Sequence, residues 1–265
     1  MAALGSQVRQ GAAVSVSPVT PPPGFESVRD GRLQLLVRAD VQSWLVPLLR
    51  AARDGWAGYA TRPLAGGRGG ARIVPVHQVV VRPYRRGGLP ARLLHDTYFG
   101  WHPRPFRELC VMATLHQRGA PVVEVYGAAV AWVTPACYRG WLATRYVDGA
   151  RTFWEWASAP PPAAPSATAG KTVFRDIGRA IRRLHDCGGR HPDLNANNIL
   201  LAPRAGVLFL DFDRARLAAA NGTPPARDLD RLWRSLRKLD PQGRWVTAAD
   251  FDLLRTAYGE GPQCG

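Results

Sequence analysis

The sequence has few cysteines and no long apolar runs. Its four cysteines, at positions 110, 137, 187 and 264, form no Cys-x-x-Cys pair and have no histidine at ligand spacing. This scatter disfavours a zinc site or a disulfide scaffold and fits a reducing, cytosolic setting. No stretch approaches the roughly 18 apolar residues that a transmembrane helix needs. The amino-terminal residues also lack the basic start and apolar core of a signal peptide.

Acidic side chains are scarce as well, with 20 Asp and Glu against 35 Lys and Arg, so the formal net charge is +15. A field of this sign favours anionic partners such as nucleic acid, an acidic membrane surface or a phosphorylated substrate. Arginine dispersed over solvated faces is the alternative. One basic set falls at helical spacings of three and four in the last long helical segment, and for it both interpretations stay open: Arg227, Arg231, Arg234, Arg237 and Lys238.

The most informative segment runs from Arg190 to Asp213. It places Asn198 five residues after Asp193, and two short apolar runs follow, at 199–201 and 207–210. The turn residues between these runs, 202–206, predict a β-hairpin. Such a hairpin brings the loop before its first strand close to Asp211, which follows its second strand.

This convergence predicts a phosphoryl-transfer site. Asp193 would accept the proton of an attacking hydroxyl, while Asn198 and Asp211 would supply the hard oxygen ligands that Mg²⁺ prefers. Taken singly, Asp193 is an ordinary turn residue and Asn198 a strand-edge cap. The joint pattern with Asp211, flanked by phenylalanine, favours a kinase-like site that uses ATP and Mg²⁺.

Upstream residues supply the remaining parts of a nucleotide site. A glycine cluster containing Gly67 and Gly69 precedes two β-branched runs at 71–76 and 77–82, and it predicts either a cover over nucleotide phosphates or a plain hairpin turn. Arg82 stands where a protein kinase carries the lysine of Val-Ala-Ile-Lys. Apolar residues recur at helical spacing over 106–116, where Glu108 is the natural partner for Arg82.

The rest of the pattern predicts an α+β, protein-kinase-like fold with two lobes. We expect a short helix within 30–56, strands at 122–125, 128–133 and 141–146, and a helix over 171–187. Backbone groups around Arg145 would meet the adenine. The expected division is a flexible leader over 1–24, a small β-rich N-lobe over 25–147, and a mainly helical C-lobe over 148–265 with a mobile Pro-rich loop at 159–170.

Four segments in this order carry a family resemblance: Tyr84-Arg85-Arg86-Gly87-Gly88, Phe106-Arg107-Glu108, Asp193-Leu194-Asn195-Ala196-x-Asn198, and Asp211-Phe212-Asp213-Arg214. Together they resemble the bacterial 3-deoxy-D-manno-octulosonic acid (Kdo) kinases, relatives of the lipopolysaccharide core heptose kinases. The resemblance runs from about residue 66 to 239.

This resemblance implies ATP-dependent phosphorylation of the 4-hydroxyl of the sugar acid on Kdo-lipid A. It also implies a peripheral enzyme at the cytoplasmic face of the bacterial inner membrane. We expect no nucleic-acid partner. Arg85, Arg86 and Asn195 are the expected substrate contacts. Which of the two arginines meets substrate stays open.

Departures from protein kinases narrow the substrate. Asn195 stands where serine/threonine kinases usually carry lysine, Asp213 replaces the glycine of Asp-Phe-Gly, and no Ala-Pro-Glu follows. A protein substrate is therefore disfavoured. The alternatives are a heptose kinase or another small-molecule kinase, and a non-catalytic kinase-like module that binds an anionic membrane or nucleic acid. Aminoglycosides, which are cationic, fit the charge of +15 poorly.

Overall fold

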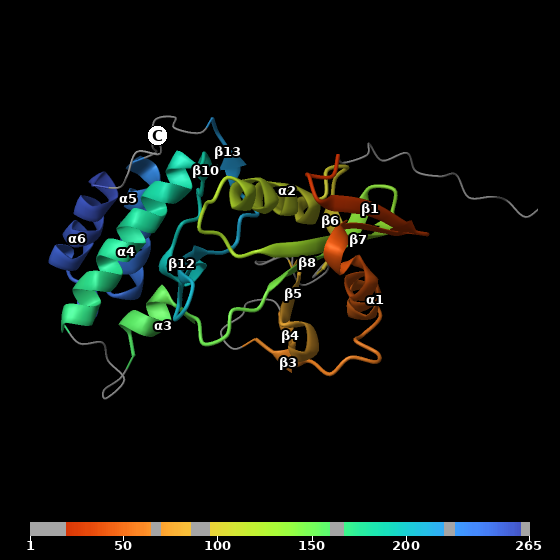
Figure 1. Ribbon diagram of the computed structural model, residues 1–265, viewed down its shortest axis with the longest axis horizontal. Helices are drawn as coiled ribbons and strands as arrows, with labels where there is room; N and C mark the ends of the chain where they lie inside the picture. The colour runs from red at the N-terminus through yellow and green to blue at the C-terminus, as the bar shows by residue number, and fades with distance from the viewer. Residues whose placement is uncertain (1–19, 65–69, 86–95, 160–166, 220–225, 261–265) are drawn as a thin grey trace, which may run out of the picture.

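The computed structural model describes residues 20–64, 70–85, 96–159, 167–219 and 226–260. Over these residues the chain forms a β-rich N-lobe and a mainly helical C-lobe (Figure 1). This arrangement matches the predicted two-lobed α+β architecture. None of the helices within the described ranges combines the length and the apolarity needed to cross a membrane.

One antiparallel sheet forms the centre of the N-lobe. Neighbouring strands follow the order β1-β2-β7-β8-β5-β4-β3, and β6 pairs with β8. The strands are β1 (Phe25–Asp30), β2 (Leu33–Arg38), β3 (Arg62–Pro63), β4 (Arg72–Val74), β5 (Val79–Pro83), β6 (Tyr98–Phe99), β7 (Val125–Thr134) and β8 (Cys137–Arg145).

Two helices cover opposite faces of this sheet. Figure 1 shows α2 (Arg104–Gln117) above it and α1 (Gln42–Arg53) below it. Successive strand residues point to opposite faces. In β2, Leu33 and Leu35 accordingly pack in the cluster that contains α1, whereas Leu36 packs in the cluster that contains α2. The sheet is therefore buried on both sides and holds its strands in fixed positions.

The C-lobe contains α3 (Phe153–Ala157), α4 (Ala167–Asp186), α5 (Ala226–Leu239) and α6 (Ala248–Gly259). It also has two small sheets, one of β9 (Arg151–Thr152), β11 (Ile199–Ala202) and β12 (Gly206–Phe209), the other of β10 (Gly189–Arg190) and β13 (Arg216–Leu217). Helices α4 and α6 touch at Gly178, where an added Cβ would lie 2.2 Å from the carbonyl oxygen of Leu254. Only glycine allows this close approach.

The two lobes are joined through backbone contacts as well as through a shared core. The Phe209 N–H donates to the carbonyl of Pro121 at 2.9 Å, and the Val123 N–H donates to the carbonyl of Phe209 at 3.2 Å. Leu109 of α2 lies in the same buried cluster as Phe212. The end of β12 is therefore fixed against the chain that leaves α2.

Several predicted elements are present. The hairpin is β11 paired with β12, in a register that sets Ile199 opposite Phe209. The helix predicted over 106–116 lies within α2, and the one over 171–187 largely coincides with α4. The two β-branched runs contain β4 and β5, separated by a short 3-10 turn.

Other expectations were wrong. The strand over 122–125 is absent apart from Val125, because the backbone pairing of this segment is limited to one isolated bridge between Val122 and Phe209. Val122 and Val123 are instead core residues of a non-strand segment. The β1–β2 hairpin was not predicted, and α6 follows the basic helix α5, which is therefore not the last.

Residues 167–170 of the predicted Pro-rich loop over 159–170 belong to α4, which begins at Ala167, and residues 160–166 lie outside the described residues. Of the predicted leader over 1–24, only 20–24 belong to the described residues. Gly24 there accepts a backbone hydrogen bond from Ala39 at 3.0 Å.

Candidate active site

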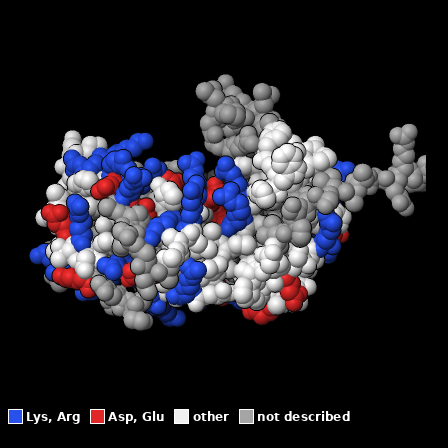
Figure 2. Space-filling model, turned by 90° about the horizontal axis from the view of Figure 1, so that it is seen from above, with Lys and Arg blue, Asp and Glu red and all other residues white. Residues whose placement is uncertain are grey.

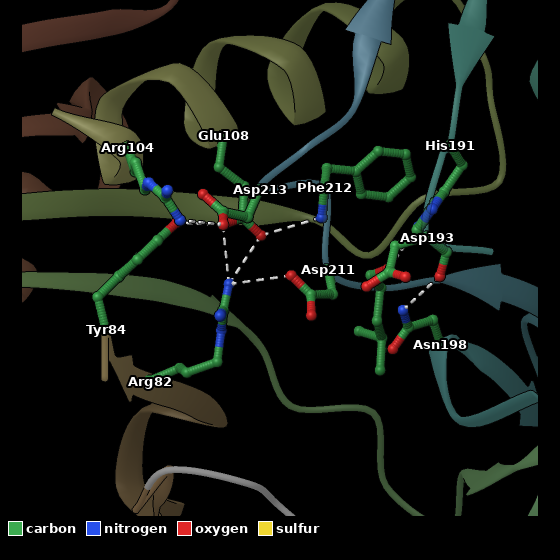
Figure 3. Close-up of polar contacts among 11 residues, drawn as sticks. Arg82, Tyr84, Arg104, Glu108, His191, Asp193, Asn198, Asp211, Phe212 and Asp213 are labelled. Carbon is green, nitrogen blue, oxygen red and sulfur yellow. Dashed lines mark hydrogen bonds and ion pairs between the residues drawn. The ribbon is translucent and has the colours of Figure 1, made fainter. Parts of the chain in front are cut away.

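Charged and polar side chains converge at the junction of the lobes (Figure 3). Strand β5 supplies Arg82 and α2 supplies Glu108. The loop after β10 supplies Asp193 and leads to Asn198, and the segment after β12 supplies Asp211. The residues that the sequence motif separates thus meet in one place, as the hairpin predicted.

Glu108 is the centre of a buried cluster, which we call the Glu108 cluster: Arg82, Tyr84, Glu108 and the backbone of Phe212. The Arg82 Nη2 lies 2.8 Å from both carboxylate oxygens. The Tyr84 hydroxyl donates to Oε2, and the Phe212 N–H donates to Oε1 at 3.1 Å. With 1% of its surface exposed, Glu108 satisfies its buried charge through these partners. The predicted Arg82–Glu108 ion pair is present.

Electrostatics in this cluster fixes the protonation of each group. Burial raises the pKa of Glu108, and the charge of Arg82 opposes that rise. Burial alone would lower the pKa of Arg82, but the attraction of Glu108 outweighs it and the pKa is raised. Burial and the negative charge of Glu108 raise the pKa of Tyr84 well above 10.0. Arg82 therefore stays a cation, and Tyr84 stays a neutral donor.

Asp211 lies between this cluster and the loop that carries Asp193 (Figure 3). Its Oδ1 is 3.9 Å from the Arg82 Nη2, and its side chain is 45% exposed. The backbone of Asp211 has φ of +62°, in the left-handed region that aspartate enters more readily than most residues. The chain therefore turns just after β12, and the Asp211 carboxylate stays accessible to a ligand.

The segment from His191 to Asn198, here called the catalytic loop, is held by its own amides. The carbonyl oxygen of Asp193 accepts from the side-chain amides of Asn198 at 3.0 Å and Asn195 at 2.8 Å. Asn195 Oδ1 accepts from the Asn197 N–H at 3.0 Å. Both ends of the Asn195 side chain thus serve the loop, and its expected substrate contact stays a prediction.

Two buried side chains, those of Asp228 and His191, hold this loop in place through hydrogen bonds. The carboxylate of Asp228 on α5 accepts from the His191 N–H at 3.0 Å and lies 3.1 Å from the His185 Nε2. The His191 Nε2–H donates a hydrogen bond to the carbonyl oxygen of Leu210 at 2.9 Å. Burial lowers the pKa of His191, so its ring is neutral and joins the catalytic loop to the residue just before Asp211.

The donor set fits magnesium. Asn198 uses its Nδ2 on the loop, which leaves its Oδ1 for a ligand, and Asp211 offers a half-exposed carboxylate. No group of three or more His, Cys, Asp and Glu side chains suited to a metal occurs within the described ranges. Two oxygen ligands from protein, completed by phosphates and water, are typical of Mg²⁺ sites in kinases.

Comparison with known families decides the class. The model of the family described as "Lipopolysaccharide kinase (Kdo/WaaP) family" matches residues 60–258. The chain belongs to this family. The prediction of an ATP-dependent phosphotransferase is thereby confirmed.

Similar proteins agree with this assignment. The chain is 35% identical over 211 residues to the 3-deoxy-D-manno-octulosonic acid kinase of Xylella fastidiosa strain M12, covering 77% of this chain and 81% of that protein. It is 35% identical over 209 residues to the kinase of the same name from Xanthomonas campestris pv. campestris strain B100, covering 76% and 80%. The resemblance predicted from the four sequence segments is therefore confirmed.

A solved structure, "WaaP in complex with acyl carrier protein", is similar in fold. It aligns with a TM-score of 0.55 at 16% sequence identity, covering 86% of this chain and 90% of that chain. The predicted protein-kinase-like fold class is confirmed.

Other predicted site residues lie apart from the central cluster of this lipopolysaccharide kinase. Arg145 ends β8, where its N–H donates to the Glu124 carbonyl at 2.9 Å and its guanidinium lies 3.7 Å from the Glu124 carboxylate. Arg85 lines a hollow of the N-lobe together with Arg72 and Arg139. Their expected roles stay predictions. Gly67, Gly69 and Arg86 fall outside the described residues.

Four residues at the site of this kinase were not predicted to belong to it. Tyr84 lies in the first of the four family segments, but its contact with Glu108 was not predicted. Asp228 is a buried aspartate inside an amphipathic helix, and no neighbouring residue in the sequence indicates that it contacts the catalytic loop. Arg104 pairs with Asp213 at 3.0 Å. Arg231, counted with the basic face of α5, forms an ion pair with Asp193.

Proposed function

We propose that this kinase transfers the γ-phosphoryl group of ATP to the 4-hydroxyl of Kdo on Kdo-lipid A. The transfer uses Mg²⁺ and takes place at the cytoplasmic face of the bacterial inner membrane. The observation that carries the proposal is the convergence of Asp193, Asn198 and Asp211 beside the Glu108 cluster in a member of this family. Relatives named 3-deoxy-D-manno-octulosonic acid kinase supply the substrate class.

In this mechanism Asp193 is the general base. Its carboxylate accepts the proton of the acceptor hydroxyl as the oxygen forms a bond to the γ-phosphorus and the bond to the ADP oxygen breaks. Asn198 and Asp211 would hold Mg²⁺, which would neutralise charge on the phosphates. Arg82 adds a positive charge that Glu108 keeps in place.

Surface charge supports the membrane setting. Figure 2 shows Lys and Arg side chains gathered over the C-lobe half of the face seen from above, and more sparsely over the N-lobe half. A basic residue close to an anionic membrane surface contributes about 1 kcal/mol of attraction. Trp101 is 64% exposed and Phe99 is 60% exposed. Exposed aromatic rings favour the membrane–water interface.

Mass spectrometry tests the proposal. Purified enzyme is incubated with Kdo-lipid A and ATP, with parallel reactions that omit ATP, omit enzyme, or contain EDTA. The expected result is a mass gain of one phosphate only in the complete reaction, with fragmentation placing it on the 4-hydroxyl of Kdo. A gain only on a heptose-bearing acceptor would instead assign the chain to the heptose kinases, and ATP binding without any transfer would favour a non-catalytic module.

A further inference from the structure

Arg231 reaches the catalytic loop from α5. It lies three residues after Asp228, whose carboxylate holds the His191 backbone, so the same turn of helix supports the loop and contacts its base. The Arg231 Nη2 donates to the Asp193 Oδ1. The two side chains are 47% and 38% exposed, so this pair faces solvent and is open to a ligand.

The guanidinium of Arg231 has donors to spare. It makes no hydrogen bond or ion pair other than that with Asp193 among the residues that the structure describes. A guanidinium carries five N–H donors in a planar fork, which matches a carboxylate with two parallel hydrogen bonds. Arg231 can therefore touch Asp193 and a second anion together.

The position of Arg231 favours the acceptor over the nucleotide. The cation beside the proposed magnesium ligand Asp211 is Arg82, which comes from β5 in the N-lobe. Arg231 instead approaches Asp193 from α5 in the C-lobe. Asn195 brings no charge to the loop, and both ends of its side chain are engaged there. A fixed positive charge thus lies next to the group that meets the acceptor hydroxyl.

We propose that Arg231 is an acceptor-binding residue that holds the carboxylate of the sugar acid beside the hydroxyl that Asp193 deprotonates. This inference rests on the proposed function. The sugar acid carries its carboxylate and its 4-hydroxyl on the same ring, so a base and an arginine in contact can address both groups. The arrangement selects anionic acceptors over neutral sugars, because without the carboxylate the second set of hydrogen bonds is lost.

The test compares two acceptors. One is the Kdo-bearing lipid A and the other is its carboxyl-reduced analogue, which keeps the 4-hydroxyl and loses the charge. The variants are Arg231→Ala and Arg231→Lys. The matched control is Arg234→Ala, which removes the same charge from an exposed position on the same helix. Initial rates give KM and kcat for each acceptor and for ATP.

We expect Arg231→Ala to raise the KM for the Kdo-bearing acceptor by roughly 10- to 100-fold, the usual effect of losing hydrogen bonds between charged groups. The KM for the reduced analogue and for ATP should stay within about twofold, so the preference for the carboxylate disappears. Arg231→Lys should recover part of this preference, because it keeps the charge without the fork. Arg234→Ala should keep the preference of the wild-type enzyme.

Equal losses on both acceptors, a raised KM for ATP, or an unchanged preference would each overturn the role of Arg231. If Arg231→Ala fails to fold, as judged by its melting temperature, the test uses Arg231→Lys and compares its KM values for the two acceptors. A wild-type enzyme that transfers phosphate to neither acceptor would overturn the proposed function itself. If the wild-type enzyme is active but the Arg231 variants keep its ratio of KM values for the two acceptors, only this inference is overturned.

Discussion

The Glu108 cluster and the catalytic loop meet at Asp211 but differ in how water reaches them. Glu108 is 1% exposed, whereas the side chain of Asp193 is 38% exposed. If the Glu108 carboxylate is removed, the buried Phe212 N–H loses its acceptor, and an unpaired buried group is costly. If the Asp193 carboxylate loses its partner, solvent can replace that partner. We infer that the cluster stabilises the fold and the loop performs the chemistry. Four substitutions and a change of pH test this division.

Asp193→Asn should have the largest effect, and on activity alone. Loss of a general base lowers the transfer rate by about 10²- to 10⁴-fold. The melting temperature should barely change, because surface substitutions usually alter stability by less than about 0.5 kcal/mol. Steady-state kinetics and thermal unfolding check both parts, with the exposed Asp176→Asn on α4 as control. Full activity of Asp193→Asn would remove Asp193 from the role of base.

Glu108→Ala should act mainly on stability. It leaves the Arg82 guanidinium and the Phe212 N–H without their buried acceptor, at a cost of about 2–4 kcal/mol. Tyr84→Phe removes one of the hydrogen bonds to Glu108 and should cost about 1 kcal/mol. Urea unfolding measures both free energies.

Glu26→Gln, at an exposed position of β1, is the control for these two variants. If Glu108→Ala costs no more than Glu26→Gln, the cluster does not stabilise the junction of the lobes.

Asp228→Ala should affect both stability and activity, because this residue is buried but holds the loop that carries the partly exposed Asp193. Its loss leaves the His191 N–H without an acceptor, which costs about 1–3 kcal/mol and frees the loop to shift. We therefore expect both the unfolding free energy and kcat to fall. The exposed neighbour Asp230→Ala, on the same helix, is the matched control. A drop in stability with unchanged kcat would show that the loop keeps its geometry without Asp228.

Acidification should have the smallest effect, through His191. Burial lowers the pKa of this ring below its ordinary value of 6.5, so the unfolded chain binds a proton that the folded chain does not. Stability from this group is present above pH 6.5 and is lost as the pH falls below it. The slope is at most about 1.4 kcal/mol per pH unit.

Unfolding free energies of wild type and His191→Asn between pH 5 and 7.5 measure this contribution. The buried Nδ1 of His191 has no hydrogen-bond partner among the described residues, so a proton placed there would gain no acceptor. Equal slopes for both proteins would show that another group dominates the acid response.

Local patterns predicted much of this site. The hairpin could be predicted because two apolar runs flank turn residues, and its register then places Asp211 near Asn198. The Arg82–Glu108 pair could be predicted because Arg82 stands where a protein kinase carries its lysine, and an amphipathic helix with Glu108 follows. The first prediction depends on neighbouring residues, and the second on a known kinase motif inside one lobe.

Contacts between distant segments could not be predicted in this way. Asp228 and Arg231 reach the catalytic loop from 37 and 38 residues further along the chain. Their positions depend on how α5 packs, and the helical spacing of its arginines indicated only a charged face. The contacts of Asn195 could not be predicted either. The motif gives its place in the loop, but the direction of its side-chain amide depends on the local turn.

Helix α2 is tied to the C-lobe through its first turns and through the segment that follows it. Arg104 at its start pairs with Asp213, Glu108 accepts from the Phe212 backbone, and residues 121 and 123 exchange backbone hydrogen bonds with Phe209. If this helix swung outward, the contacts of Arg104 and Glu108 with the C-lobe would break together. The position of the carboxylate that pairs with Arg82 is therefore set by how α2 rests against the C-lobe.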